Sequence, residues 1–276
     1  MHTKTIADKD SGVAPGAAPE RVAQRSWFGR STRRLFVVYF VLVHIVVFVV
    51  LWQPGIVSRI EKFVRKTPAS QPEYRGMMTA HSVVLQSMPK ESTVYLGDSR
   101  LRDMDVTSIS EGPVYNLSIG GDTTRGLQTR LKHYQHLDRC RLVVVGVGVN
   151  DLSHFSDEES LQAYEWILCY MKDVGVRSVV VCSVLPVDEA TYQQANSAWI
   201  RGHRTTNARI ATYNEGLRSL CSRFTFVSFV DSTADVADES GNLRQGFSTD
   251  GLHLSESGNR AWAASLERSI KRLPKS

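Results

Sequence analysis

The stretch VYLGDSRLRDMD, Val94–Asp105, places an apolar run directly before Gly97, Asp98 and Ser99. The run has the length and composition of a buried β-strand, and the glycine marks the point where it ends. In a parallel sheet, ligands bind outside the carboxyl ends of the strands. The stretch therefore has two interpretations: an ordinary strand end, or a serine placed at the sheet edge for chemistry.

The chain from Thr93 onward alternates short apolar runs with helical patterns. The expected strands are TVYLG, VYNLS, RLVVVGVG, SVVVCSV and FTFVSFV. The first, third and fourth are apolar on both faces, as strands covered by helices on two sides should be. Helical patterns are expected at 123–138, 157–174, 205–224 and 255–273. This alternation predicts an α/β fold, a three-layer α/β/α domain with a parallel sheet, over residues 91–276.

The N-terminal part of the chain has a different composition. Residues 1–34 lack apolar periodicity and are predicted to form a disordered, basic tail. Residues 35–52 are apolar except for His44. At about 1.5 Å per residue this run gives a helix of roughly 27 Å, close to the thickness of the hydrocarbon core of a bilayer. We expect an uncleaved transmembrane helix here, because no small-residue cleavage site follows a shortened apolar core.

Residues 53–90 are expected to be a helical linker, either a stalk or a segment packed on the domain. Five arginines lie within about fifteen residues before the apolar run and four Lys or Arg follow it. The positive-inside rule then favours a cytoplasmic N-terminus. The sequence thus predicts a single-pass protein of a bacterial inner membrane, with its main domain outside the cytoplasm.

Several classes of partner are disfavoured by the sequence. The net charge of +5 owes much to the residues that flank the apolar run, and no basic stripe interleaved with aromatics indicates nucleic acid. The four cysteines show neither CxxC nor Cys/His spacing, so we expect no metal site. Neither GxGxxG nor a Walker A pattern is present, and we expect no soluble cofactor.

Polar residues follow several of the predicted strands. Gly120 and Gly121 follow the second strand, Asn150 follows the third, and DGLH, Asp250–His253, precedes the last helix. A serine hydroxyl is a poor nucleophile unless an imidazole takes its proton and a carboxylate orients that imidazole. His253 and Asp250 supply these groups for Ser99. The backbone N–H groups of Ser99 and Gly121 and the Asn150 amide are candidate donors to a developing oxyanion.

The ordered motifs GDS, GGD, GxND and DxxH resemble the SGNH hydrolase superfamily, also called GDSL esterases/lipases. The segment NLSIGGDTTRG is similar to the branch that contains the platelet-activating-factor acetylhydrolase catalytic subunits. The resemblance covers residues 92–271 and implies a flavodoxin-like sheet of five parallel strands. It also implies that Ser99 is the nucleophile, His253 the base and Asp250 its orienter, with Ser99, Gly121 and Asn150 forming the oxyanion hole.

Three further residues near these motifs have less reactive interpretations. Arg100 stands where the family motif has leucine; it could place a cation by the pocket, but we expect a solvent-facing residue in the first helical turn. Asp98 and Asp122 are expected to brace their loops as hydrogen-bond acceptors.

Three functions are compatible with this sequence. The first is a membrane-anchored serine esterase that removes a small acyl group, namely acetyl, from a cell-envelope or exported glycan or another acylated small molecule. The second is an O-acyltransferase that passes the acetyl group to a polysaccharide as part of an envelope polysaccharide machinery. The third is a catalytically silent adaptor that binds glycan.

Overall fold

The computed structural model describes residues 30–52, 72–195 and 205–273. Helix α1 (Arg30–Trp52) belongs to one unit, and the elements from α3 (Pro72–Ser87) onward belong to a second. Residues 1–29 of the predicted tail and residues 53–71 of the predicted linker lie outside the described residues. Within the described parts of the chain, no helix has both the length and the apolar character needed to cross a membrane.

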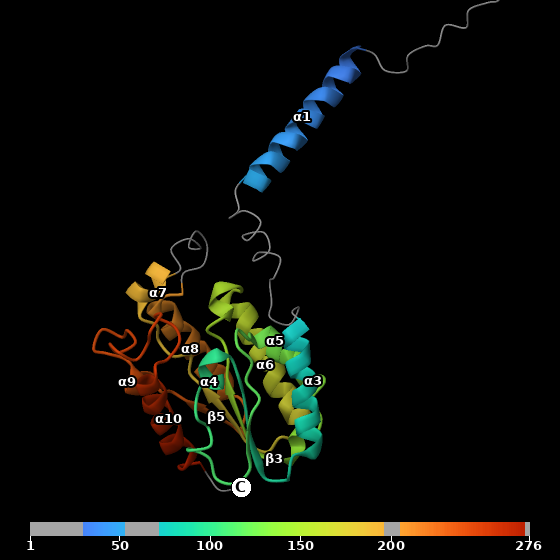
Figure 1. The fold of residues 1–276 in the computed structure, drawn as a ribbon. Coiled ribbons are helices and arrows are strands. Elements are labelled where there is room, and N and C mark those ends of the chain that lie inside the picture. The colour runs from blue at the N-terminus through green and yellow to red at the C-terminus, as the bar shows by residue number, and fades with distance from the viewer. Residues whose placement is uncertain (1–29, 53–71, 196–204, 274–276) are drawn as a thin grey trace, which may run out of the picture. The chain divides into compact units, whose positions relative to one another are not determined.

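The second unit alternates strands and helices, as the sequence pattern predicts (Figure 1). Its strands are β1 (Ser92–Gly97), β2 (Val114–Asn116), β3 (Cys140–Gly146), β4 (Val179–Cys182) and β5 (Val227–Val230). After α3, its helices are α4 (Ser99–Arg102), α5 (Thr124–Leu131), α6 (Asp157–Asp173), α7 (Glu189–Ala195), α8 (Asn207–Cys221), α9 (Thr233–Val236) and α10 (Glu256–Ile270). Two short 3-10 turns, Leu137–Arg139 and Asp151–Ser153, precede and follow β3.

The five strands form one parallel sheet in the order β2-β1-β3-β4-β5. This confirms the predicted five-stranded parallel sheet. The chain runs from β1 to β2 on one side of β1 and then crosses from β2 to β3 on the other side. The topological switch point therefore lies between β1 and β3. In such sheets the switch point opens a crevice at the carboxyl ends of the strands. Ser99 follows β1 and Asn150 follows β3, and both therefore lie at this edge.

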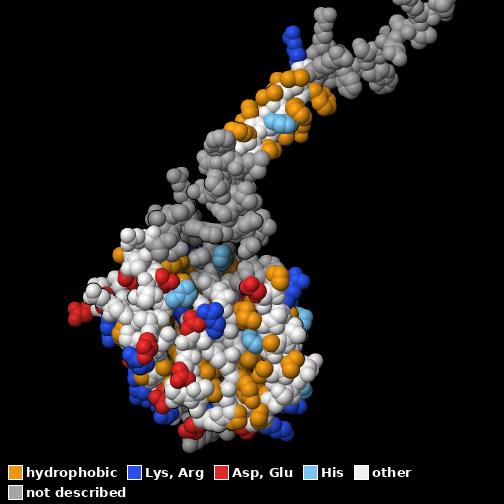
Figure 2. Space-filling view, viewed as in Figure 1, with side chains coloured by type: hydrophobic (Ala, Val, Ile, Leu, Met, Phe, Trp, Pro, Cys, Tyr) orange, Lys and Arg blue, Asp and Glu red, His pale blue; other side chains and the backbone are white. Residues whose placement is uncertain are grey.

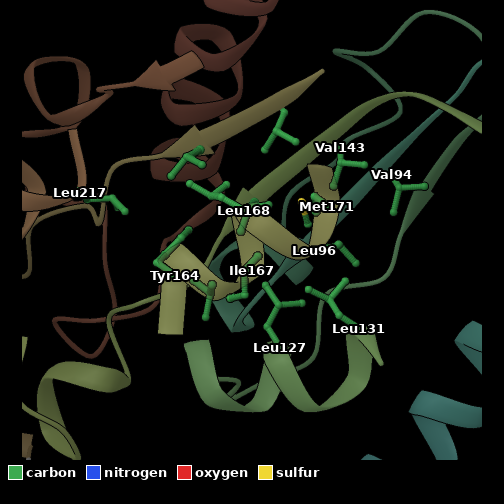
Figure 3. Close-up of a cluster of buried hydrophobic side chains, with 14 of the residues drawn as sticks. Val94, Leu96, Leu127, Leu131, Val143, Tyr164, Ile167, Leu168, Met171 and Leu217 are labelled. Carbon is green, nitrogen blue, oxygen red and sulfur yellow. The ribbon is translucent and has the colours of Figure 1, made fainter. Parts of the chain in front are cut away.

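Apolar side chains cover both faces of the sheet. On one face, side chains such as Val94, Leu96 and Val143 pack against α3, α5, α6 and α8, and Figure 3 shows part of this cluster with Leu127 and Ile167. The other face carries a second cluster with α9 and α10. Burying one large aliphatic side chain contributes roughly 1.5–3 kcal/mol to the stability of the fold. Each cluster buries many such side chains, and this packing fixes the strands and the edge at which they end.

Capping residues explain where several helices begin. Ser156 and Glu159 form a capping box at the start of α6, and Thr123 and Ser255 accept backbone N–H groups at the starts of α5 and α10. Helix α5 is shorter than the predicted 123–138, because the chain leaves the helix after Leu131 and turns through His136, whose φ is 66°. The apolar residues beyond Leu131 still pack into the core, which is why the pattern looked helical.

Helix α3 lies within the segment predicted as a linker and packs on the sheet domain. Leu85 and the following Met88 are buried in the first core cluster. The segment between β4 and α8 contains a helix, α7, and residues 196–204 of this segment lie outside the described residues.

Candidate active site

Ser99 occupies the first position of α4, directly after β1. The Asp98 carboxylate caps this helix by accepting the backbone N–H of Arg100 at 2.9 Å. Gly97 is required at the end of the strand, because a Cβ there would lie 2.5 Å from the carbonyl oxygen of Gly146 and 2.8 Å from the Leu101 side chain. The close approach of β1, β3 and α4 thus fixes the position of the serine.

The structure brings Ser99, His253 and Asp250 together. His253 Nε2 lies 3.0 Å from Ser99 Oγ, and His253 Nδ1 lies 2.6 Å from Asp250 Oδ2. Ser99 is buried, whereas the His253 and Asp250 side chains are each 44% exposed. A hydroxyl, an imidazole and a carboxylate therefore form one hydrogen-bonded chain that solvent reaches from the imidazole side.

The histidine loop, which we define as residues 248–254, holds the last two groups. Asp250 Oδ1 accepts the backbone N–H groups of Leu252 at 2.9 Å and His253 at 2.7 Å. Burial opposes the charge on Asp250, but the His253 ring and these two N–H donors hold the pKa of Asp250 below its ordinary value. Asp250 is therefore ionised at neutral pH and can orient the imidazole.

Gly251 lets the histidine loop turn tightly against the chain that follows β4. Its φ of +84° falls in the left-handed region, and a Cβ would lie 2.4 Å from the backbone nitrogen of Tyr192. The Gly251 carbonyl also accepts the backbone N–H of Asp188 at 2.9 Å. The position of the imidazole thus depends on the segment after β4.

Gly121 and Asn150 lie on two loops that contact each other. The backbone N–H of Ile119 donates to the Gly97 carbonyl at 2.9 Å, which extends the pairing with β1 up to the Gly120–Gly121 turn. Gly121 adopts a φ of 74°, and Asn150 Nδ2 donates to the carbonyl of the next residue, Asp122, at 2.9 Å. Two of the predicted oxyanion donors are therefore joined at the same edge as Ser99.

Asp122 anchors the Gly121 loop through a buried network. Its carboxylate accepts Arg130 Nε at 2.9 Å and Tyr74 Oη at 3.1 Å, and both members of the Asp122–Arg130 ion pair are fully buried. Burial opposes the charge on Arg130, but Asp122 raises the pKa of Arg130 above its ordinary value. The loop-bracing role predicted for Asp122 is confirmed, and Asp98 has the same role as the cap of α4.

The sequence interpretation missed Arg130 and Tyr74. One signal for Arg130 was present: it falls on the face of α5 that carries Leu127 and Leu131, where a charged residue needs a buried partner. Tyr74 comes from α3, so the helix assigned to the linker supports a loop of the site.

Asp151 forms a second buried support. Its Oδ2 accepts the backbone N–H of Thr124 at 3.0 Å, and its Oδ1 accepts the Thr124 hydroxyl. Burial raises the pKa of Asp151 from 3.8 to about 7. The start of α5 is thereby attached to the loop that carries Asn150.

The prediction for Arg100 was wrong. The side chain is not solvent-facing: the residue is only 4% exposed, and its guanidinium donates to three backbone carbonyls. The first turn of α4 faces the histidine loop and the segment after β4, and these two segments enclose the arginine.

Among the described residues, no group of three or more His, Cys, Asp or Glu side chains is placed to bind a metal ion. The four cysteines are all free thiols, three of them buried.

The domain is a three-layer α/β/α fold with a parallel sheet, and a hydrogen-bonded Ser-His-Asp triad lies at the carboxyl ends of its strands. These two features define a serine hydrolase. The model of the GDSL-like Lipase/Acylhydrolase family matches residues 98–261, which is more than half of the chain. The chain belongs to this family and is a serine hydrolase that acts on carboxylic esters.

Solved structures share the fold. A protein from Streptococcus pneumonia named for platelet activating factor superposes with a TM-score of 0.65 at 24% identity, covering 78% of this chain and 97% of that one. A GDSL-like lipase from Bacteroides thetaiotaomicron gives a TM-score of 0.59 at 17% identity, covering 71% and 97%. A lipase/acylhydrolase from Enterococcus faecalis gives 0.53 at 20% identity, covering 68% and 99%. Comparison with the curated proteins gave no match.

Proposed function

We propose that Ser99 is the nucleophile of an esterase that works through an acyl-enzyme, with His253 as general base and Asp250 as its orienter. One observation carries this proposal: the continuous chain of hydrogen bonds from Ser99 Oγ through the imidazole to Asp250, with links of 3.0 and 2.6 Å. At 3.0 Å the imidazole can take a proton from the Ser99 hydroxyl, and at 2.6 Å the Asp250 carboxylate can orient the ring.

The first half of the reaction transfers the acyl group to the enzyme. Ser99 Oγ attacks the carbonyl carbon of the ester while its proton passes to His253 Nε2. The carbonyl oxygen becomes an oxyanion, which the N–H groups of Ser99 and Gly121 and the Asn150 amide stabilise. The tetrahedral intermediate then breaks its bond to the alcohol oxygen, which leaves with the proton from His253.

The second half releases the acyl group. Water gives a proton to His253 and attacks the Ser99 ester, and the acid leaves as Ser99 regains its proton. An acceptor hydroxyl can take the place of water because the same base activates either group. Adding an acetylated donor together with a glycan acceptor therefore separates an esterase from an O-acyltransferase: we expect free acetate as the main product.

Substitution of Ser99 tests the proposal. We expect Ser99→Ala to lower the hydrolysis rate of a chromogenic acetyl ester by about 10³-fold or more. Ser108→Ala is the matched control, because Ser108 is an exposed serine on the loop after α4. Equal rates in the parent and the Ser99→Ala variant would refute the assignment.

The substrate is proposed to be an acetyl ester, which the resemblance of NLSIGGDTTRG to the acetylhydrolase branch supports. Acetyl, butyryl and octanoyl esters of one chromogenic alcohol distinguish the possibilities. We expect the highest kcat/KM for the acetyl ester, and a preference for octanoyl would exclude a pocket built for small acyl groups.

Attachment to a membrane through residues 35–52 is part of the proposal. The support is the apolar run in the sequence, together with large apolar side chains on α1 that are 38–69% exposed. Figure 2 shows hydrophobic side chains along the visible face of this helix. The full chain should stay with the membrane fraction during alkaline extraction and leave it in detergent. A C-terminal reporter active only outside the cytoplasm tests the orientation, which would give the enzyme access to envelope glycans.

A further inference from the structure

We propose that Arg100 is a positioning residue that holds the His253 imidazole against Ser99, an inference that rests on the function proposed above. Arg100 follows the serine directly in α4, so its backbone moves with the nucleophile. Its guanidinium binds two other segments of the chain, and one of these carries the histidine.

The three hydrogen bonds of Arg100 come from three different nitrogens. Nε donates to the Leu252 carbonyl at 2.9 Å, Nη1 to the Leu185 carbonyl at 2.7 Å and Nη2 to the Pro186 carbonyl at 3.1 Å. Leu252 immediately precedes His253. The residue after the nucleophile is therefore bonded to the residue before the base.

The segment after β4 completes the contact. Leu185 and Pro186 precede Asp188, whose backbone N–H donates to the Gly251 carbonyl at 2.9 Å. The histidine loop is thus bonded both to the arginine and to the segment that the arginine holds. Without the guanidinium, this loop loses a direct donor and one side of its support.

A salt-bridge explanation does not account for Arg100. Within the described part of the chain the ion pairs do not include it, and all its side-chain hydrogen bonds go to neutral carbonyls. The planar guanidinium carries N–H donors on three nitrogens and can donate to carbonyls in different directions. The lysine ammonium has all its N–H donors on one nitrogen. The arrangement therefore needs the shape of the guanidinium as well as its charge.

Substitution by leucine and by lysine separates shape from charge. We expect Arg100→Leu to lower kcat for a soluble acetyl ester by about 100-fold, with KM changed by less than about threefold, because a small displacement of the imidazole affects the chemical step most. We expect Arg100→Lys to lower kcat by a similar factor. A wild-type rate in the lysine variant would overturn the proposal, because charge alone would then suffice.

A spectroscopic readout reports the imidazole position directly. The short His253–Asp250 hydrogen bond should give a far-downfield proton resonance in the wild-type protein, and we expect it to broaden or disappear in Arg100→Leu while the near-ultraviolet circular dichroism stays native. Retention of both this resonance and the wild-type kcat would overturn the proposal.

Arg141→Leu is the matched control. Arg141 is a partly buried arginine that also donates to a backbone carbonyl, that of Glu111 at 3.4 Å, but it lies near the start of β3, at the opposite edge of the sheet. Its kcat should stay within about twofold of the parent. If both Arg100 variants fail to fold while Arg141→Leu folds, Arg100 is a structural residue and the positioning role is refuted.

Different results would refute the role of Arg100 and the proposed function. If Ser99→Ala hydrolyses the ester as fast as the parent, the proposed function fails. If Ser99→Ala is inactive but the Arg100 variants are fully active, only the role of Arg100 fails.

Discussion

His253 Nε2 lies 3.0 Å from Ser99 Oγ, although 154 positions separate the two residues in the chain. The serine is fixed by the end of a central strand, whereas the imidazole is carried by a loop between elements at the other end of the sequence. The contact therefore depends on the packing of the whole domain. It also depends on Asp250, whose Oδ2 accepts a hydrogen bond from His253 Nδ1 at 2.6 Å.

Replacing Asp250 by asparagine tests its orienting role. An asparagine oxygen can still accept the loop N–H groups, but the amide cannot stabilise the imidazolium or select the tautomer. We expect Asp250→Asn to lower kcat by about 10³- to 10⁴-fold with little change in Tm. Asp238→Asn is the control, because exposed Asp238 also accepts two loop N–H groups, those of Ser240 and Asn242, and should keep full activity.

The Asn150 amide is predicted to act in the transition state. Asn150→Ala removes one donor to the oxyanion, so we expect kcat to fall by about 10²- to 10³-fold while KM changes little. Steady-state kinetics with the acetyl ester measure both constants. A rise in KM at constant kcat would instead indicate that Asn150 binds the ground state.

Removing one partner of the buried Asp122–Arg130 pair is predicted to destabilise the fold strongly. Arg130→Met leaves the Asp122 carboxylate buried without its charge partner, and we expect the free energy of unfolding to fall by about 3–5 kcal/mol. The exposed pair Arg177–Glu91 supplies the control, since Arg177→Met should cost less than about 1 kcal/mol. Urea unfolding followed by fluorescence measures both values, and similar losses would contradict the prediction.

Asp151 is predicted to make stability depend on pH. Burial raises its folded-state pKa from 3.8 to about 7, so between these values the folded chain holds a proton that the unfolded chain has released. The contribution of Asp151 to the free energy of unfolding is therefore complete below pH 3.8 and is lost as the pH rises toward 7. In Asp151→Asn the free energy of unfolding should fall less steeply over this range.

Denaturant unfolding at a series of pH values measures this effect. Asp173→Asn serves as the control because Asp173 is exposed, and it should keep the parental slope. An unchanged slope in Asp151→Asn would show that the proton is held elsewhere.

The sheet and the convergence of the candidate site residues at one edge were predictable because their signals are local. Apolar runs end at Gly97 and near Asn150, and the motifs that follow place Ser99, Asn150 and His253 on loops at one edge of a parallel sheet. Helix α5 was predicted too long, because Tyr134 and Leu137 continue its apolar pattern after the chain has left the helix.

The burial of Arg100 could not be predicted in the same way. Its partners are backbone carbonyls 85, 86 and 152 positions away. Because every residue has a backbone carbonyl, the sequence does not indicate which of them will accept a hydrogen bond from Arg100. The Tyr74–Asp122 contact joins residues 48 positions apart, on a helix assigned to the linker and on a loop of the site. Such contacts exist only once the tertiary fold has formed.

The most direct test is to identify the residue that carries the acyl group. Rapid quenching during hydrolysis of an excess of acetyl ester, followed by peptide mass spectrometry, should find acetyl on the peptide containing Ser99, with much slower formation in His253→Ala and normal formation in the exposed control His133→Ala. Acetyl on a different residue, or acetylation of Ser99 at the parental rate without the imidazole, would contradict the account.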